Sequence, residues 1–116
     1  MNCTVSEIDK YKVLKLTGTI DWEKARILDN TLKELIDKGF IQIVIDLNEV
    51  FFMCSGSLGA LAYNYSIVNR ANGNIYLIFS TKYIKYLFET ISFDIVFKGY
   101  IYESIENFEK SVIYKR

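Results

Sequence analysis

Apolar positions recur along this chain in two spacings, one typical of strands and one typical of helices. Residues 4–18 alternate loosely between apolar and polar positions, which predicts two short strands with a turn between them. Residues 41–47 form a β-branched, nearly continuous apolar run, and residues 75–79 form a second one. Such runs are typical of strands that are covered on at least one face and lie inside a sheet. Residues 95–97 are expected to add a short edge strand.

Four other segments repeat their apolar residues every three or four positions, as one face of a helix requires. The first follows Asp21, a suitable N-cap, and ends before Gly39, a suitable C-terminal residue. The second is expected over residues 57–70, the third begins after Thr81, and the fourth starts near Ser104. The apolar positions on the four faces are Ala25, Leu28, Leu32, Leu35, Ile36, Leu58, Leu61, Ala62, Tyr65, Val68, Ile84, Leu87, Phe88, Ile91, Ile105, Phe108 and Val112.

The order of these elements indicates the fold class. Strands and helices alternate after an initial hairpin, which implies an α/β domain with a mixed, mostly parallel sheet of four to five strands and about four helices. The hairpin adds an antiparallel edge at the N-terminus. The sequence contains no proline and no Gly/Ser stretch typical of a linker, so residues 1–116 are expected to form a single domain.

Composition and charge weaken several classes of function. Hydrophobic residues make up 51% of the 116 positions, which is typical of a globular domain. The 14 Lys and Arg residues balance 14 Asp and Glu residues, so no positive field favours nucleic acid. Histidine is absent, which removes Ser-His and Cys-His nucleophile pairs and the commonest zinc ligand. A non-enzymatic protein without a metal or cofactor is expected.

Cysteine use and hydropathy indicate a compartment. Cys3 and Cys54 form no CxxC pair, and the chain resembles a reduced cytoplasmic protein. Residues 1–12 lack the apolar segment of a signal peptide. No apolar run approaches the roughly 20 residues that cross a bilayer, so no direct membrane insertion is expected.

The segment with the clearest functional signal joins the 41–47 strand to the second predicted helix. Residues 54–59 read Cys-Ser-Gly-Ser-Leu-Gly. In parallel α/β sheets, ligands and partners bind where strands end and helices begin. A helix N-terminus offers free amide groups and about half a positive charge, which stabilises an anion such as a phosphoryl group. The alternative interpretation is that Ser55 or Ser57 serves only as the helix N-cap.

Residues 43–61, IVIDLNEVFFMCSGSLGAL, resemble the core of STAS domains, the fold of the anti-sigma factor antagonists. The family pattern is an apolar strand, Asp-Leu, a few residues, Val with two or three apolar residues, and then Asp-Ser-Ser/Thr-Gly-Leu-Gly. The matching positions are Asp46, Leu47, Val50, Ser55, Leu58 and Gly59. Weaker matches extend the likeness over residues 18–21, 72–79, 87–97 and 102–107.

This resemblance implies a regulator that binds an anti-sigma factor, often a serine kinase, and thereby frees the sigma factor. In the family, phosphorylation of the serine directly after the motif Asp breaks the complex, and a phosphatase restores it. Ser55 stands at that position, and Ser57 is a second candidate. A phosphoryl group adds about −1.5 to −2 charge to a surface fitted to a neutral serine.

The motif departs from the family pattern beside Ser55. Cys54 replaces the family Asp, which removes a carboxylate, and Ser57 replaces the family Gly. Gly56, at the second hydroxyl position, is expected to supply the backbone freedom instead. The resemblance places the partner-binding surface at Met53, Cys54, Ser55, Gly56, Ser57, Leu58, Gly59 and Tyr63.

The aromatic residues are assigned by the face on which they are predicted to lie. Tyr63 is expected to be exposed near the motif, where aromatic side chains often anchor protein interfaces. Trp22 is expected to pack under the first helix. The phenylalanines expected in the core are Phe51, Phe52, Phe79 and Phe88.

Three alternative functions are open at this point. STAS-like subunits also occur in lipid-transport ATP-binding-cassette complexes and in stress-signalling assemblies. A thiol near a helix N-terminus can have a lowered pKa, so Cys54 is a candidate nucleophile or redox sensor, although no histidine is present to act as base. A nucleotide site is disfavoured, because residues 55–59 lack the GxxxxGK[ST] pattern and any lysine.

Overall fold

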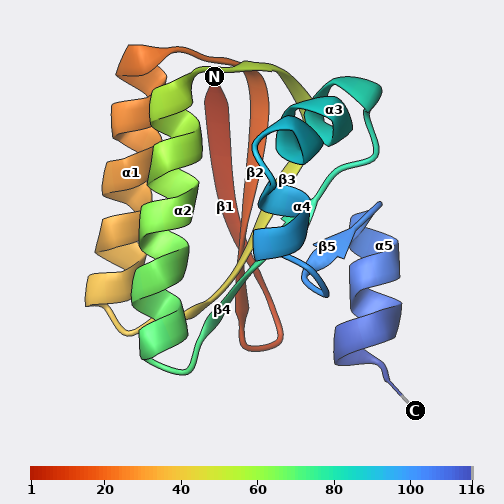
Figure 1. The fold of residues 1–116 in the computed structure, drawn as a ribbon. Coiled ribbons are helices and arrows are strands. Elements are labelled where there is room, and N and C mark those ends of the chain that lie inside the picture. Colours follow the sequence, from red (N-terminus) through yellow and green to blue (C-terminus); the bar gives the residue numbers. More distant parts are fainter. Residues whose placement is uncertain (116) are drawn as a thin grey trace.

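The computed structural model describes residues 1–115 as a five-stranded sheet with helices on both faces (Figure 1). The strands are β1 (Asn2–Ile8), β2 (Tyr11–Ile20), β3 (Gln42–Met53), β4 (Asn74–Ile78) and β5 (Ile101–Tyr102). The helices are α1 (Trp22–Asp37), α2 (Ser55–Arg70), α3 (Lys82–Thr90), α4 (Phe93–Val96) and α5 (Ile105–Phe108), and a π-helical turn, η1 (Glu109–Ile113), continues α5. None of these helices is long and apolar enough to cross a membrane.

The sheet follows the order of the chain, β1-β2-β3-β4-β5. β1 and β2 form an antiparallel hairpin, and each later strand pairs in parallel with the one before it. Helix α1 connects β2 to β3, α2 connects β3 to β4, and α3 with α4 connects β4 to β5. The predicted α/β fold, with its antiparallel edge hairpin and parallel remainder, is confirmed.

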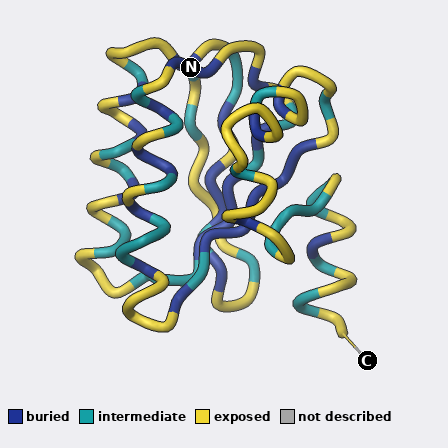
Figure 2. The backbone as a smooth tube through the Cα atoms, viewed as in Figure 1, coloured by how far each residue is buried: buried dark blue, intermediate teal, exposed yellow. Residues whose placement is uncertain are grey.

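The larger core lies between the sheet and helices α1 to α4. Alternate residues of β2, β3 and β4 point to this face, because successive side chains of a strand point to opposite sides. Figure 2 shows the dark blue, buried stripes of α1 and α2 turned toward the sheet. The fully buried residues of this core are Leu14, Leu16, Ile20, Leu28, Leu32, Ile43, Ile45, Leu47, Leu61, Val68, Ile75, Leu77, Ile84, Phe88 and Phe97.

A smaller, aromatic core holds the C-terminal helix on the opposite face of the sheet. Phe108 of α5 meets Tyr11 and Tyr76 edge to face, with ring centroids 5.2 and 5.1 Å apart. Burial, reinforced by the nearby Tyr11, raises the pKa of Tyr76 to about 12. The helix predicted to start near Ser104 is therefore confirmed, and it packs on the aromatic side chains of the sheet.

Three predicted elements differ from the structure. Residues 95–97 are not a strand: α4 covers 93–96, and the edge strand is β5. Ser92 has a left-handed backbone, which starts a new helical turn there, and a short apolar run fits a helix as well as a strand. β3 extends beyond the predicted 41–47 because its ladder with β2 continues to Met53. Helix α2 begins at Ser55, two residues before its predicted start.

Some aromatic assignments were also wrong. Phe51 is 74% exposed and Phe52 is also exposed, although Phe79 and Phe88 lie in the core as predicted. β4 pairs with β3 only as far as Asp46, and in the last part of β3 the side chains of Leu47, Val50 and Met53 pack in the larger core. The side chains of Phe51 and Phe52 are not part of that core and stay at the surface.

Gly73, in the turn that connects α2 to β4, provides a test of the packing of this turn against Ile41. It is buried, and a Cβ atom there would lie against the backbone carbonyl oxygen of Ile41. We expect Gly73→Ala to lower the free energy of unfolding by about 2 kcal/mol or more, because neither backbone can yield easily. The matched variant Gly59→Ala meets no atom within 4 Å and should unfold at the same or higher urea concentration. Equal midpoints for the two variants would contradict this packing.

Candidate functional site

Helices α1 and α2 begin side by side at one edge of the sheet. Ile20 and Met53, the last residues of β2 and β3, are paired in the ladder. The N–H of Cys54 donates to the carbonyl oxygen of Ile20 at 3.0 Å. Both helix N-termini therefore lie at the edge where the parallel strands end, which is the usual position of a functional site in this class of sheet.

The two helix starts differ in how they are capped. Asp21 caps α1, since its carboxylate accepts a hydrogen bond from the N–H of Lys24 at 2.9 Å. Cys54 occupies the same position before α2 but makes no side-chain cap, and the first turn of α2 contains no acidic residue. The partial positive charge of this helix end therefore meets no compensating side chain, and the site favours an anion.

Ser55 and Ser57 lie in opposite environments. Ser55, the first residue of α2, is exposed. Ser57 has 0% of its surface exposed, and its hydroxyl donates to the carbonyl oxygen of Cys54 at 2.6 Å. The prediction of Ser57 as a reserve phosphoacceptor is therefore corrected: its hydroxyl belongs to the closed first turn of the helix. Ser55 keeps the accessibility that a modification site requires.

The predicted partner-binding surface is smaller than the sequence indicated. Met53 and Cys54 are buried, like Ser57, and their side chains contribute to the larger core. A buried side chain offers no surface to a second protein, so these three assignments are corrected. The predicted residues that remain at the surface or partly exposed are Ser55, Gly56, Leu58, Gly59 and Tyr63.

Gly56 is needed for contact between the two helices rather than for backbone freedom. A Cβ atom at this position would lie 2.7 Å from Cζ3 of Trp22 and 2.8 Å from Cε3. The indole of Trp22 therefore lies directly against α2, and it does so at the surface, 66% exposed. The prediction that Trp22 packs under α1 was wrong, because the ring turns toward the second helix instead.

A groove of about 350 Å³ runs between α1 and α2 from this contact. Its floor consists of small residues, and its two large aromatic side chains are Trp22 and Tyr63. Tyr63 is 58% exposed, as the sequence predicted. The lining residues are Trp22, Ala25, Arg26, Asp29, Lys33, Gly56, Gly59, Ala60 and Tyr63.

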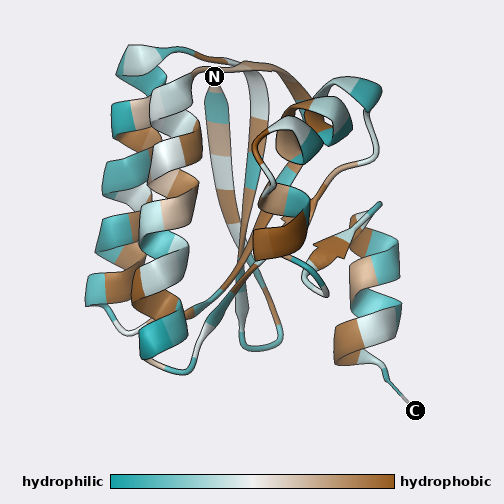
Figure 3. Ribbon diagram, in the orientation of Figure 1, coloured by the Kyte–Doolittle hydropathy of each residue, from teal (hydrophilic) through white to brown (hydrophobic). Residues whose placement is uncertain are grey.

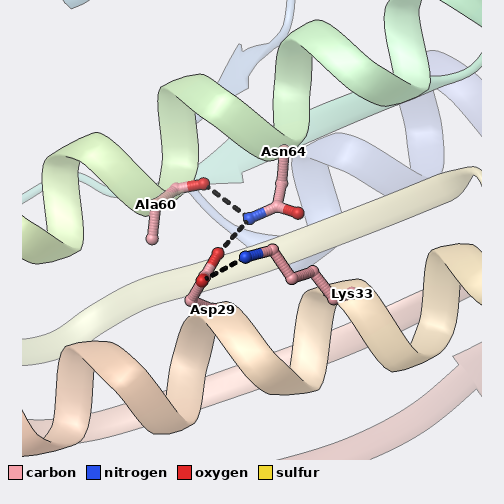
Figure 4. Close-up of polar contacts among 4 residues, drawn as sticks. All are labelled: Asp29, Lys33, Ala60 and Asn64. Carbon is pink, nitrogen blue, oxygen red and sulfur yellow. Dashed lines mark hydrogen bonds and ion pairs between the residues drawn. The ribbon is translucent and has the colours of Figure 1, made fainter.

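A polar cluster joins the two helices next to this groove (Figure 4). The side-chain amide of Asn64, which is buried, donates to Asp29 Oδ1 and to the carbonyl oxygen of Ala60, both at 2.8 Å. Lys33 Nζ lies 2.7 Å from Asp29 Oδ2. Burial alone would raise the pKa of Asp29, but the hydrogen bonds from Lys33 and Asn64 outweigh it, and the pKa is lowered. Asp29 is therefore an ionised link between α1 and α2.

Exposed aromatic side chains surround the start of α2. Phe51 and Phe52 lie within four residues of Ser55, and Tyr83 of α3 accepts a hydrogen bond from the N–H of Met53 at 3.1 Å. Large exposed apolar side chains near one another are typical of protein interfaces. Phe51, Phe52 and Trp22 were predicted to be buried, because an apolar pattern does not show which positions lack a covering element.

The cysteines and the acidic side chains are the candidates for a metal site and for reactive thiols. Within residues 1–115, no group of three or more His, Cys, Asp or Glu side chains is placed to hold a metal ion. Both cysteines are free, and burial raises the pKa of the Cys3 thiol. Cys54 is buried in the larger core.

Comparisons with known proteins agree on the kind of domain. The family profile of the STAS domain matches residues 2–108. No curated protein matches the sequence. A putative anti-sigma factor antagonist from Thermotoga maritima has a TM-score of 0.82 at 20% identity, over 96% of this chain and 94% of that one. An anti-sigma factor antagonist from Mycobacterium paratuberculosis has a TM-score of 0.81 at 21% identity, over 90% and 87%.

The anti-sigma factor antagonist SpoIIAA is also similar, in two forms. Its unphosphorylated form has a TM-score of 0.77 at 14% identity, over 99% of this chain and 100% of that one. The phosphorylated form of the Bacillus protein has a TM-score of 0.70 at 14% identity, over 86% and 88%. The fold is thus that of an α/β domain of the SpoIIAA type. The chain belongs to the STAS domain family, whose profile spans nearly its whole length.

The contact between Gly56 and Trp22 can be tested by fluorescence, because Trp22 is the only tryptophan. We expect Gly56→Ala to push the indole away from α2, since the added Cβ would overlap the ring. The emission maximum should shift to longer wavelength as the ring becomes more solvated. Gly59→Ala, one turn further along α2, should leave the spectrum unchanged. An unchanged spectrum for Gly56→Ala would refute the contact.

The burial of Cys54 predicts slow alkylation. In the native protein at neutral pH, iodoacetamide should modify Cys54 far more slowly than in urea, because the thiol is enclosed by the core. A time course with mass mapping measures this rate, and a Cys3→Ser variant isolates the Cys54 signal. If Cys54 reacts as fast in the native protein as in urea, the reactive-thiol alternative gains support.

Proposed function

We propose that this protein acts as an anti-sigma factor antagonist: it binds an anti-sigma factor through the surface around Ser55, and phosphorylation of Ser55 releases that partner. The observation that carries the proposal is an exposed serine at the first position of an uncapped helix. Exposed aromatic side chains flank it. Anti-sigma factor antagonists among the similar structures, one of them solved in a phosphorylated form, support the same assignment.

The free serine presents a small neutral group at the centre of a contact surface. Trp22 and Phe52 can bury apolar area against a partner, at roughly 25 cal/mol per Å² removed from water. Ser55 itself adds little bulk, so a partner can approach the first turn of α2 closely. The partner in this proposal is an anti-sigma factor that is also a serine kinase, and both act in the cytoplasm.

Phosphorylation changes this surface without destabilising the fold. The added charge of about −1.5 to −2 meets free amide groups at the start of α2, where it is favourable. The same charge and bulk lie where the partner must fit closely. Each 1.4 kcal/mol of lost affinity is a tenfold change, so two unfavourable contacts are enough to release the partner. A phosphatase that removes the group would restore binding.

Cys54 replaces the carboxylate that precedes this serine in related proteins, and the structure indicates what this substitution changes. Cys54 is buried and leaves the helix end uncapped, so the phosphoryl group would encounter no neighbouring negative side chain in the first turn. Like-charge repulsion on the modified form is thereby reduced. The proposal therefore includes a phosphorylated state that the fold tolerates well.

The test uses the cognate kinase and ATP, followed by mass mapping. We expect one phosphate on Ser55 and none on the buried Ser57. Ser55→Asp should weaken binding to the anti-sigma factor by about tenfold or more, because a single introduced charge in a close-fitting interface costs more than 1 kcal/mol. Ser55→Ala should bind like the parent protein.

Ser111→Asp is the control for added charge alone, since Ser111 is exposed in the C-terminal helical turn. It should bind the partner normally. Two results would refute the switch: a phosphate that maps elsewhere, or a Ser55→Asp variant with unchanged affinity.

A further inference from the structure

The groove between α1 and α2 has an open floor that another molecule can occupy. A Cβ atom added at Gly59 would meet no atom within 4 Å, so the space above this residue is empty. Gly56 and Ala60 continue the floor on either side. Small residues let two helices approach closely, but here they also leave room for a side chain from outside.

Two aromatic side chains border this empty space. Trp22 lies against Gly56 at one end, and Tyr63 lines the groove further along α2. Both are more than half exposed although both are among the largest apolar side chains. Exposed aromatic side chains around a pocket are the usual composition of an interface hot spot. The groove therefore provides a site for one apolar anchor residue.

The charges that line the groove favour a negatively charged neighbour of that anchor. Asp29 is already bonded to Lys33 and Asn64. Arg26 is exposed and, within residues 1–115, takes part in no ion pair. Its guanidinium is free to form a bidentate bond with a carboxylate.

We propose that the groove receives one apolar side chain of the anti-sigma factor, seated over Gly59 between Trp22 and Tyr63, and that an adjacent carboxylate of the same partner pairs with Arg26. This inference rests on the proposed function, because Gly56 lines the groove and directly follows Ser55. The site of modification thus lies at one end of the groove. A phosphoryl group there repels the partner's carboxylate, so the groove also contributes to release.

Two pairs of variants test the groove by isothermal titration with the cognate anti-sigma factor. Gly59→Leu fills the space and should weaken binding about 30-fold or more, as expected for a lost hot spot, whereas Gly59→Ala should stay within about twofold. Arg26→Gln should weaken binding about threefold to tenfold and reduce its dependence on salt. Lys38→Gln removes a charge at the other end of α1 and should have no effect on affinity.

The position of the partner can be observed directly. The chain has one tryptophan, so 5-fluorotryptophan labelling places a single ¹⁹F signal on Trp22. Complex formation should shift this signal in the parent protein and in Gly59→Ala. Gly59→Leu should alter the free signal and reduce the shift. Circular dichroism checks that each variant is folded. If Gly59→Leu does not fold, Tyr63→Ala replaces it as the variant that alters the groove.

The outcomes separate the two proposals. If the parent protein binds the anti-sigma factor but Gly59→Leu and Arg26→Gln bind equally well, the groove is not the docking site and the proposed function stands. If the Trp22 signal does not move on binding, the groove proposal also fails. If the parent protein does not bind an anti-sigma factor at all, both proposals fail together.

Discussion

The close approach of α1 and α2 is the constraint on which the candidate site depends. β2 and β3 are adjacent and parallel, so the helices that follow them lie side by side on one face of the sheet. Gly56 allows the Trp22 indole to rest against α2, and Asn64 ties the two helices together through Asp29. A larger residue at position 56 would overlap the Trp22 ring and disturb this contact. In Figure 3, α1 carries both hydrophilic and hydrophobic bands, α2 is mostly of intermediate hydropathy, and α4 is largely hydrophobic.

The start of α2 lacks the stabilising side-chain cap that α1 and α3 have. Asp21 caps α1 and Thr81 caps α3 through side-chain hydrogen bonds, whereas Cys54 provides none. A missing cap costs about 1 kcal/mol. The missing cap lies at the start of α2, where the helix begins with the exposed Ser55. Sites that bind a partner or accept a modification commonly depart from local rules in this way.

The order of strands and helices could be predicted from the sequence because it depends on periodicity, which is local. The helix that begins after Asp21 and the strand over residues 75–79 follow directly from residue spacing. Burial is different, because it depends on which element lies opposite. Phe51 and Phe52 have the same apolar pattern as Val50 and Met53, but Val50 and Met53 pack in the larger core and the two phenylalanines are exposed.

The candidate site shows the same division between local pattern and spatial contact. The family resemblance located Ser55 from residues close to it in the sequence. Which of Ser55 and Ser57 faces solvent depends on where α2 begins. The helix was predicted to begin at Ser57, but it begins at Ser55, and Ser57 is therefore buried inside its first turn. The contact of Trp22 with Gly56 joins residues far apart in the chain. No pattern in a single sequence reports such a pairing.

The sequential strand order also has a consequence for how the molecule assembles. Every strand pairs with the one made just before it, so none has to be threaded between two strands that are already bonded. Only the β1-β2 hairpin closes a short loop, whereas each parallel strand closes over a whole helical crossover and so pairs later and more slowly. During synthesis the sheet can therefore grow at one edge, with each new unit adding to a finished one. When α2 has been synthesised, β2, α1 and β3, which lie next to Ser55, have already been made, and the hydroxyl of Tyr83 reaches the neighbouring Met53 only later.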